Sequence, residues 1–164
     1  MTTPVPAVRV ARATETVMLH DLWLSTPDRA EWAPAEGPTA PLLAELDLLC
    51  VDRRLWMALD GDKAVGFAGA GEIDSGLFLS VFGVLQSHRD RGHGGALLSA
   101  VVSFGTAANY PAVYAVAHRG GAGHGFLRGN GFIDLEPDRL SPAIATVIAG
   151  AGQGERCIVM ARPL

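Results

Sequence analysis

The sequence has few of the features that mark secreted, metal-binding or membrane proteins. Only two of its 164 residues are cysteines, Cys50 and Cys157, and they lie far apart in apolar surroundings without the pair spacing of a metal site. We interpret them as buried free thiols. No uninterrupted apolar run approaches the ~20 residues that span a bilayer, and the first residues lack the apolar middle of a signal peptide. The sequence therefore favours a cytoplasmic protein without a membrane partner.

Positive charge is also scarce. The chain has thirteen Lys and Arg residues and seventeen Asp and Glu residues, so the formal net charge is −4. Nucleic-acid binding usually requires a net basic surface, so nucleic acid is not expected as a generic partner. With 49% hydrophobic and 18% charged residues, the chain has enough apolar material for one core. We expect residues 1–6, which carry Pro4 and Pro6, to form a short tail, and residues 7–164 to form one domain.

Against this acidic background, cations gather in one short stretch. A hydrophobic, β-branched run over Leu77–Leu85 predicts a largely buried strand, and apolar spacing resumes at Leu97 and Leu98 as in a helix. Between the two lie cations and interleaved glycines: His88, Arg89, Arg91, Gly92, His93, Gly94 and Gly95. Glycines let backbone N–H groups turn toward a ligand, and the start of a helix adds partial positive charge. The stretch therefore predicts a cradle for a pyrophosphate.

The spacing Arg89-x-x-Gly92-x-Gly94 follows the predicted strand and opens the predicted helix. It resembles the Arg/Gln-x-x-Gly-x-Gly/Ala signature of the GNAT superfamily of acetyl-CoA-dependent N-acetyltransferases. Two other phosphate-binding motifs do not fit. A Walker loop requires a Gly-Lys-Ser/Thr ending, and a dinucleotide fingerprint requires a third glycine at a spacing that Gly92-His93-Gly94 lacks.

The resemblance implies an α/β fold: a single GNAT-like domain with a mixed, mostly antiparallel sheet and helices on both faces. It implies transfer of an acetyl group from acetyl-CoA to a primary amine on a small molecule or a peptide, without a metal. It leaves a homodimer open. By resemblance, the strand before the glycine loop separates from its neighbour, so that Phe82, Gly83 and Val84 bind the pantetheine arm. The pyrophosphate would lie on Asp90 to Gly95, with Arg89 beside it, which gives the full set of expected cofactor-binding residues: Phe82, Gly83, Val84, Arg89, Asp90, Arg91, Gly92, His93, Gly94 and Gly95.

The rest of the chain predicts an alternation of helices and strands. Strands are expected at residues 8–10, 55–59, 64–70, 113–117 and 157–161. Thr14 is placed to cap a helix whose apolar stripe would contain Met18, Leu22 and Trp23. A second helix would begin at Pro41, and its core face would contain Leu42, Leu43, Leu46, Leu49 and Cys50. A helix after the glycine loop would bury Leu97, Val101, Phe104 and Ala108. The loop from Ser25 to Pro41, with Trp32 in its middle, is either an ordinary connection or a wall of the acceptor site.

The segment from His118 to Phe132 departs from the family pattern. When it is aligned on Gly131-Phe132, the family's common Asn falls on Gly120. The common Tyr, often the proton donor to the leaving thiolate, falls on Leu127. Six glycines between Gly120 and Gly131 also weaken a helix, so we expect a short, mobile one.

The catalytic base is less clearly indicated than the cofactor loop. His118 follows a predicted strand that should end beside the thioester, and His124 lies in the glycine-rich segment after it. Glu72 and Asp74 flank a turn of the sheet and are the carboxylate alternatives. Histidine changes charge near neutral pH and can accept the amine proton directly or through water. A second hypothesis is a module that binds acetyl-CoA without turnover, because the Tyr and Asn positions are lost. A metalloprotein built on His88, His93, His118 and His124 is disfavoured, since their spacings match no common ligand motif.

Overall fold

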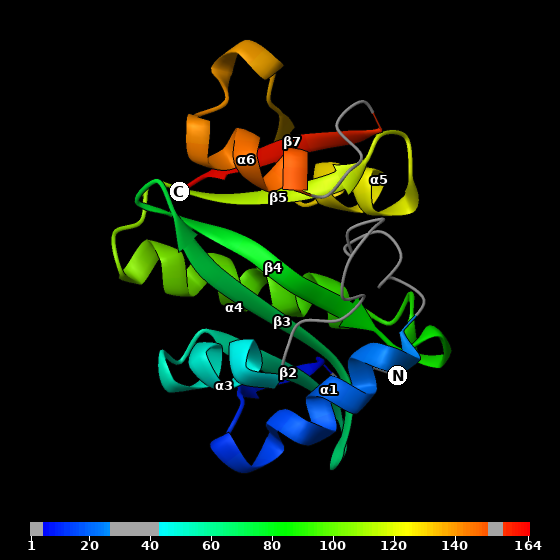
Figure 1. Cartoon of the computed structure of the whole chain (residues 1–164). Helices are drawn as coiled ribbons and strands as arrows, with labels where there is room; N and C mark the ends of the chain where they lie inside the picture. The colour runs from blue at the N-terminus through cyan, green and yellow to red at the C-terminus, as the bar shows by residue number, and fades with distance from the viewer. Residues whose placement is uncertain (1–4, 27–42, 151–155) are drawn as a thin grey trace.

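The computed structural model describes residues 5–26, 43–150 and 156–164, which form one seven-stranded sheet with helices on both faces (Figure 1). The strand order is β1-β2-β3-β4-β5-β7-β6. The strands are β1 (Ala7–Val10), β2 (Leu55–Asp60), β3 (Lys63–Ile73), β4 (Gly76–Val84), β5 (Ala112–His118), β6 (Ile133–Asp134) and β7 (Cys157–Pro163). Every neighbouring pair is antiparallel except β4 and β5, which are parallel. The expected mixed, mostly antiparallel sheet is confirmed.

The five described helices are α1 (Thr16–Ser25), α3 (Leu43–Val51), α4 (His93–Ala107), α5 (Ala122–Gly129) and α6 (Pro142–Gly150), with 3₁₀ turns at Ala13–Glu15, Gln86–His88 and Pro137–Arg139. Four of them, all but α6, contribute to two apolar clusters on opposite faces of the sheet. One cluster holds Leu19 of α1 and Leu46 of α3, and the other holds Leu97 of α4 and Leu127 of α5. Figure 1 shows α1 and α3 in front of the sheet and α4 behind it.

Small residues in β3 let the helices approach the sheet closely. Phe67 points to the α1 face, where its ring meets that of Trp23 edge-on at 5.8 Å. A Cβ at Gly69 would lie 2.8 Å from the Leu49 side chain and 2.6 Å from that of Val81. Glycine at position 69 therefore allows α3 to pack directly on the backbone of β3.

The first helix differs from its prediction in both start and face. Thr14 lies inside the 3₁₀ turn and does not cap α1, which begins at Thr16. The buried face contains Leu19 and Trp23, whereas Met18 is 42% exposed. The prediction was wrong at Met18 because α1 is apolar nearly all round, so the residue spacing alone fits more than one face.

Two other helix faces also need correction. In α3, Leu46 and Cys50 are buried as expected, but Leu43 is 38% exposed. In α4, Ala108 is exposed and lies at the C-cap, and Gly105 occupies the buried position. A Cβ at Gly105 would lie 2.6 Å from a Leu164 methyl group, so the C-terminus of the chain packs there. Pro41, Leu42 and Trp32, with most of the predicted Ser25–Pro41 loop, lie outside the described residues.

Both cysteines are buried thiols outside any disulfide, as the sequence predicted. The Cys50 thiol donates a hydrogen bond to the Ala11 carbonyl, with 3.3 Å between Sγ and O. Burial raises the pKa of both thiols, so neither is activated as a nucleophile. Within residues 5–26, 43–150 and 156–164, no helix is both long and apolar enough to cross a membrane.

The two parallel strands separate soon after they meet. Leu77 pairs with Val113 and Phe78 with Tyr114, and the β4–β5 ladder goes no further. Beyond this point β4 continues to Val84 and β5 to His118, and Figure 1 shows the two strands diverging. The segments that follow both strands, the glycine loop and α5, therefore lie at the same end of the sheet.

Candidate active site

The glycine loop adopts a left-handed turn that starts α4. Asp90 has a φ of 58°, and Gly92 is the N-cap of α4 with a φ of 85°, a conformation that favours glycine. The first N–H groups of a helix have no acceptor within the helix. The backbone of His93, Gly94 and Gly95 is therefore available to an anion at the start of a 15-residue helix.

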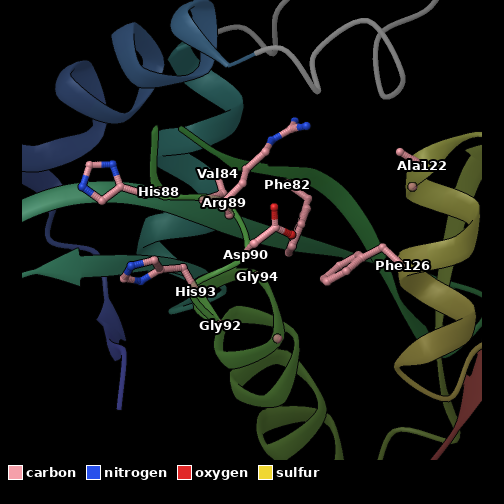
Figure 2. A pocket seen from close by; sticks show the side chains of 12 residues that line it. Phe82, Val84, His88, Arg89, Asp90, Gly92, His93, Gly94, Ala122 and Phe126 are labelled. Atoms are coloured by element: carbon pink, nitrogen blue, oxygen red, sulfur yellow. The ribbon is translucent and has the colours of Figure 1, made fainter. Parts of the chain in front are cut away.

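A cavity of about 290 Å³ opens between the start of α4 and the start of α5. It is lined by Phe82, Val84, His88, Arg89, Asp90, Gly92, His93, Gly94, Gly95, Ala122, Gly123 and Phe126 (Figure 2). Eight of the ten residues expected at a cofactor site thus surround one hollow. The other two do not line it: Arg91 is exposed, and a Cβ at Gly83 would lie 3.1 Å from the Thr26 side chain.

Two aromatic rings form the apolar side of this cavity. The ring centroids of Phe82 on β4 and Phe126 on α5 lie 5.5 Å apart, at 35° to one another. A Cβ at Gly94 would lie 3.1 Å from Cζ of Phe126 and 3.6 Å from Cζ of Phe82. A side chain at position 94 would therefore enter the hollow and press on the Phe126 ring.

Two histidines lie on the other side of the glycine loop, and their rings point away from the two phenylalanines (Figure 2). Figure 2 shows His88 and His93 on one side of the glycine loop and Phe126 and Ala122 on the other. The two imidazole centroids lie 6.1 Å apart, and Nε2 of His88 lies 3.2 Å from the Asp60 carboxylate. His93 is only 6% exposed, and its Nδ1 has no hydrogen-bond partner among the described residues. Burial, and then the nearby His88, lower the pKa of His93.

His118 ends β5, four residues before Ala122 of the cavity wall. Its neighbours Ala115 and Ala117 belong to the apolar cluster under α4, and alternation along the strand places His118 on the other face. Nε2 of His118 is buried and has no hydrogen-bond partner in the described part of the chain. Since buried polar atoms are nearly always paired, this nitrogen is a candidate for contact with a substrate.

Both ring nitrogens of His124 make contacts that hold α5 in place. Its Nδ1 accepts a hydrogen bond from the Gly120 N–H at 2.9 Å, and its Nε2 lies 2.8 Å from Oδ1 of Asp134. Arg128 binds the second oxygen of Asp134 at 2.5 Å. Burial opposes ionisation of Asp134, but the hydrogen bonds from His124 and Arg128 outweigh it and lower its pKa. His124 is thus a structural residue.

Glu72 does not lie at the cavity. It pairs with Leu77 near the β3–β4 turn, whereas Phe82 is five residues further along β4, about 16 Å away at the rise of an extended strand. The Glu72 carboxylate accepts a hydrogen bond from the Tyr110 hydroxyl and lies 3.2 Å from Nη1 of Arg54. Glu72, which the sequence offered as a base, therefore lies away from the cavity, and its carboxylate belongs to an ion-pair network at the other end of the hairpin.

Four cavity residues, His88, Ala122, Gly123 and Phe126, were not among those expected from the sequence. His88 lies in the cationic stretch, so local charge was a usable signal for it. The other three come from α5, which reaches the site because β4 and β5 diverge. Two small residues and one phenylalanine form no local sequence pattern that predicts contact with the glycine loop.

This arrangement suits a ligand that is anionic at one end and apolar along its length. Backbone N–H groups at the start of α4 and Arg89 border the part that suits an anion, and the two phenylalanines offer an apolar surface. Among the described residues, no group of three or more His, Cys, Asp or Glu side chains is placed to hold a metal ion.

Comparison with known proteins agrees with this geometry. Residues 17–132 match the acetyltransferase (GNAT) family. No curated protein sequence matches the chain significantly.

Many solved structures share the fold at low sequence identity. A GNAT-family acetyltransferase from Staphylococcus aureus Mu50 has a TM-score of 0.77 at 17% identity, covering 98% of this chain and 99% of the other. The PaiA N-acetyltransferase from Thermoplasma acidophilum, solved with coenzyme A, has a TM-score of 0.72 at 12% identity, covering 98% and 100%. The polyamine N-acetyltransferase of Drosophila melanogaster has a TM-score of 0.72 at 16% identity, covering 97% and 100%. With the family match across most of the domain and a cavity at the glycine signature, the chain belongs to the GNAT family of acetyltransferases.

Proposed function

We propose that the protein transfers an acetyl group from acetyl-CoA to a primary amine. The observation that carries this proposal is the cavity that the glycine loop and α5 enclose where β4 and β5 diverge. Its N–H groups and cations suit a pyrophosphate, and Phe82 and Phe126 suit the apolar part of a pantetheine arm. The tight space for a Cβ at Gly94, 3.1 Å from the Phe126 ring, supports a site shaped for close approach of the ligand to the backbone.

The chemistry requires little more than positioning and one proton acceptor. A neutral amine nitrogen forms a bond to the acetyl carbon while the C–S bond of the thioester breaks, and the amine loses one proton. Holding the two reactants together supplies much of the rate of such a transfer. The helix starts near the cavity would stabilise the thiolate that leaves.

We propose His118 as the base that accepts the amine proton. Its position at the end of β5 and the buried, unpartnered Nε2 support this assignment. His124 is held by Gly120 and Asp134, and Glu72 lies at the far end of the hairpin, so neither competes with it.

The departing thiolate has no side-chain acid at the usual place. Leu127, which occupies the position where the family often has Tyr, is fully buried in the apolar cluster under α4. The thiolate would leave without a dedicated acid, or take its proton from the ammonium group formed during attack. A CoA thiol is acidic enough to leave as a thiolate. Helix starts and backbone N–H groups near the cavity would stabilise that anion further.

The lack of the family's Tyr and Asn side chains favours a second candidate function. A domain with Leu127 and Gly120 in place of Tyr and Asn could bind acetyl-CoA as a sensor or structural ligand without turnover. A screen of amines separates the two functions by measuring free CoA thiol released from acetyl-CoA. The screen should span polyamines, amino acids and peptide N-termini, and Gly94→Glu serves as the inactive control. Amine-dependent thiol release that Gly94→Glu lacks supports the transferase; tight binding of acetyl-CoA without release for any amine supports the binding module.

A further inference from the structure

Asp90 places a negative charge in the loop that is expected to hold a diphosphate. The residue is exposed and lines the cavity between the starts of α4 and α5. Figure 2 shows its carboxylate on the side of the glycine loop that faces Phe82 and Phe126, unlike the two imidazoles. Asp90 makes no hydrogen bond or ion pair within the described part of the chain. Its charge is therefore open to a ligand in the cavity.

The shape of the loop does not require this carboxylate. Asp90 has a φ of 58°, in the left-handed region where glycine and asparagine fit at least as well as aspartate. The helix does not use the carboxylate as a cap, because the N-cap of α4 is Gly92, two residues later. Glycine or asparagine would keep the turn and remove the charge. What the carboxylate adds at this position is therefore electrostatic.

This charge acts against the ligand that the rest of the loop favours. Backbone N–H groups at the start of α4 and the cation of Arg89 attract an anion, whereas Arg91 is exposed and lies outside the lining. Because Asp90 lines the same cavity, a diphosphate there lies within about one Debye length of the carboxylate, ~10 Å at 0.1 M salt. The apolar rings of Phe82 and Phe126 reduce screening by water. The repulsion lowers the affinity of the site without changing its shape.

We propose that the Asp90 carboxylate weakens the hold of the site on the diphosphate, so that CoA leaves faster after acetyl transfer. This inference rests on the proposed function and concerns the affinity of its cofactor site. Acetyl-CoA and CoA share the diphosphate, so the carboxylate opposes both equally and leaves the chemical step unchanged. Among variants of one site, differences in affinity lie mostly in the dissociation rate.

Asp90→Asn is the decisive variant, because asparagine keeps the size of the side chain and tolerates the left-handed backbone while it removes the charge. Calorimetric titration with CoA at neutral pH and low salt gives the Kd of the parent and of the variant. The Kd should fall about five- to twentyfold in Asp90→Asn. The dissociation rate of CoA, measured by surface plasmon resonance on immobilised protein, should fall by a similar factor.

Matched comparisons assign the gain to the charge of Asp90. Asp90→Glu keeps the charge and should not tighten binding. Asp47→Asn, on α3 and outside the cavity lining, changes the net charge equally and should leave the Kd unchanged. High salt, about 0.5 M, should bring Asp90→Asn and the parent within about twofold, because salt screens repulsion but not a packing change. The probe 3′-dephospho-CoA, which keeps the diphosphate and lacks the phosphomonoester, should show the same gain as CoA. If Asp90→Asn fails to fold, Asp90→Gly, which also suits a positive φ, takes its place.

Unchanged or weaker binding of CoA to Asp90→Asn would overturn this inference and leave the proposed function standing. A gain that persists undiminished at high salt, or that 3′-dephospho-CoA does not share, would do the same. Failure of both CoA and acetyl-CoA to bind to the parent and to Asp90→Asn would instead overturn the proposed function, and this inference with it.

Discussion

His118 is the residue on which the proposed chemistry depends most. Histidine changes charge between pH 5 and 8, so it can accept a proton from an amine at neutral pH. His118→Ala should lower kcat by about 10²-fold or more, flatten the pH dependence of turnover and leave the affinity for acetyl-CoA unchanged. Steady-state kinetics from pH 6 to 9 measure all three, with His20→Ala as a control outside the site. Full turnover with an unaltered pH profile in His118→Ala would show that water or another group is the base.

Leu127 tests whether the lost Tyr can be restored. The side chain is fully buried in the cluster under α4, where a tyrosine would add volume and bury a hydroxyl group. Leu127→Tyr should therefore destabilise the fold by about 1–3 kcal/mol, and Leu127→Met by less. Urea unfolding at pH 7 measures both. A Leu127→Tyr protein as stable as the parent would mean that the position opens toward the cavity and could carry an acid.

At the scale of elements, α5 is a helix weakened by its own glycines. A Cβ at Gly125 would meet nothing within 4 Å, so alanine fits there and removes the entropy cost of glycine. Gly125→Ala should stabilise the protein by about 0.5–1 kcal/mol. Gly131→Ala is the contrasting variant: the residue has a φ of 88°, so alanine there should destabilise the protein. Thermal unfolding of both proteins checks the pair, and a loss of stability in Gly125→Ala would contradict this view of α5.

The elements also show where the sequence was informative. The glycine loop was predictable because strand, turn and helix start follow one another within residues 77–98, and each has its own local pattern. The buried face of α1 was not predictable, because apolar residues lie on several sides of that helix. Only its packing against Phe67 shows that Trp23 and Leu19 form the buried face. Glu72 was misplaced for a similar reason: the sequence shows a carboxylate near a turn, and only the register of β3 on β4 shows which end of the hairpin that is.

At the scale of the whole molecule, the order of elements predicted the fold, but the cavity depends on contacts between distant segments. Phe82 and Phe126 are 44 positions apart in the sequence and meet because the β4–β5 ladder stops after Phe78. Neither the composition nor the hydrophobic periodicity of β4 and β5 indicates where their pairing ends. The sequence thus pointed to the side of the cavity that the glycine loop builds and gave no signal for the side that α5 builds.

Acid stability is a property of the whole fold to which one ion pair contributes. Glu15 accepts hydrogen bonds from Arg9 at 2.9 and 2.5 Å and from the Arg12 N–H at 2.7 Å. These bonds, chiefly that of Arg9, lower the pKa of Glu15 from 4.5 to about 2. Because the folded pKa lies below the unfolded one, the contribution is complete above pH 4.5 and is lost as the pH falls toward 2.

Glu15→Gln should therefore cost about 1–2 kcal/mol at pH 7, allowing for solvent screening of the partly exposed Arg9, and much less at pH 2.5. Urea unfolding at the two pH values gives the difference. An equal loss of stability at pH 7 and pH 2.5 would show that ionisation of the Glu15 carboxylate does not contribute to the stability of the fold.

The central claim is that the glycine loop holds acetyl-CoA, and the change in melting temperature on adding acetyl-CoA tests it most directly. At about 100 times its dissociation constant, the ligand should stabilise the unmodified protein by about 2.7 kcal/mol. Gly94→Glu should abolish this gain, since its side chain would meet Phe126 and bring negative charge to the anion site. Gly71→Glu, where a Cβ meets nothing within 4 Å at the far end of the β3–β4 hairpin, should keep it. A melting temperature that millimolar acetyl-CoA leaves unmoved, or that rises equally in Gly94→Glu, would contradict the account.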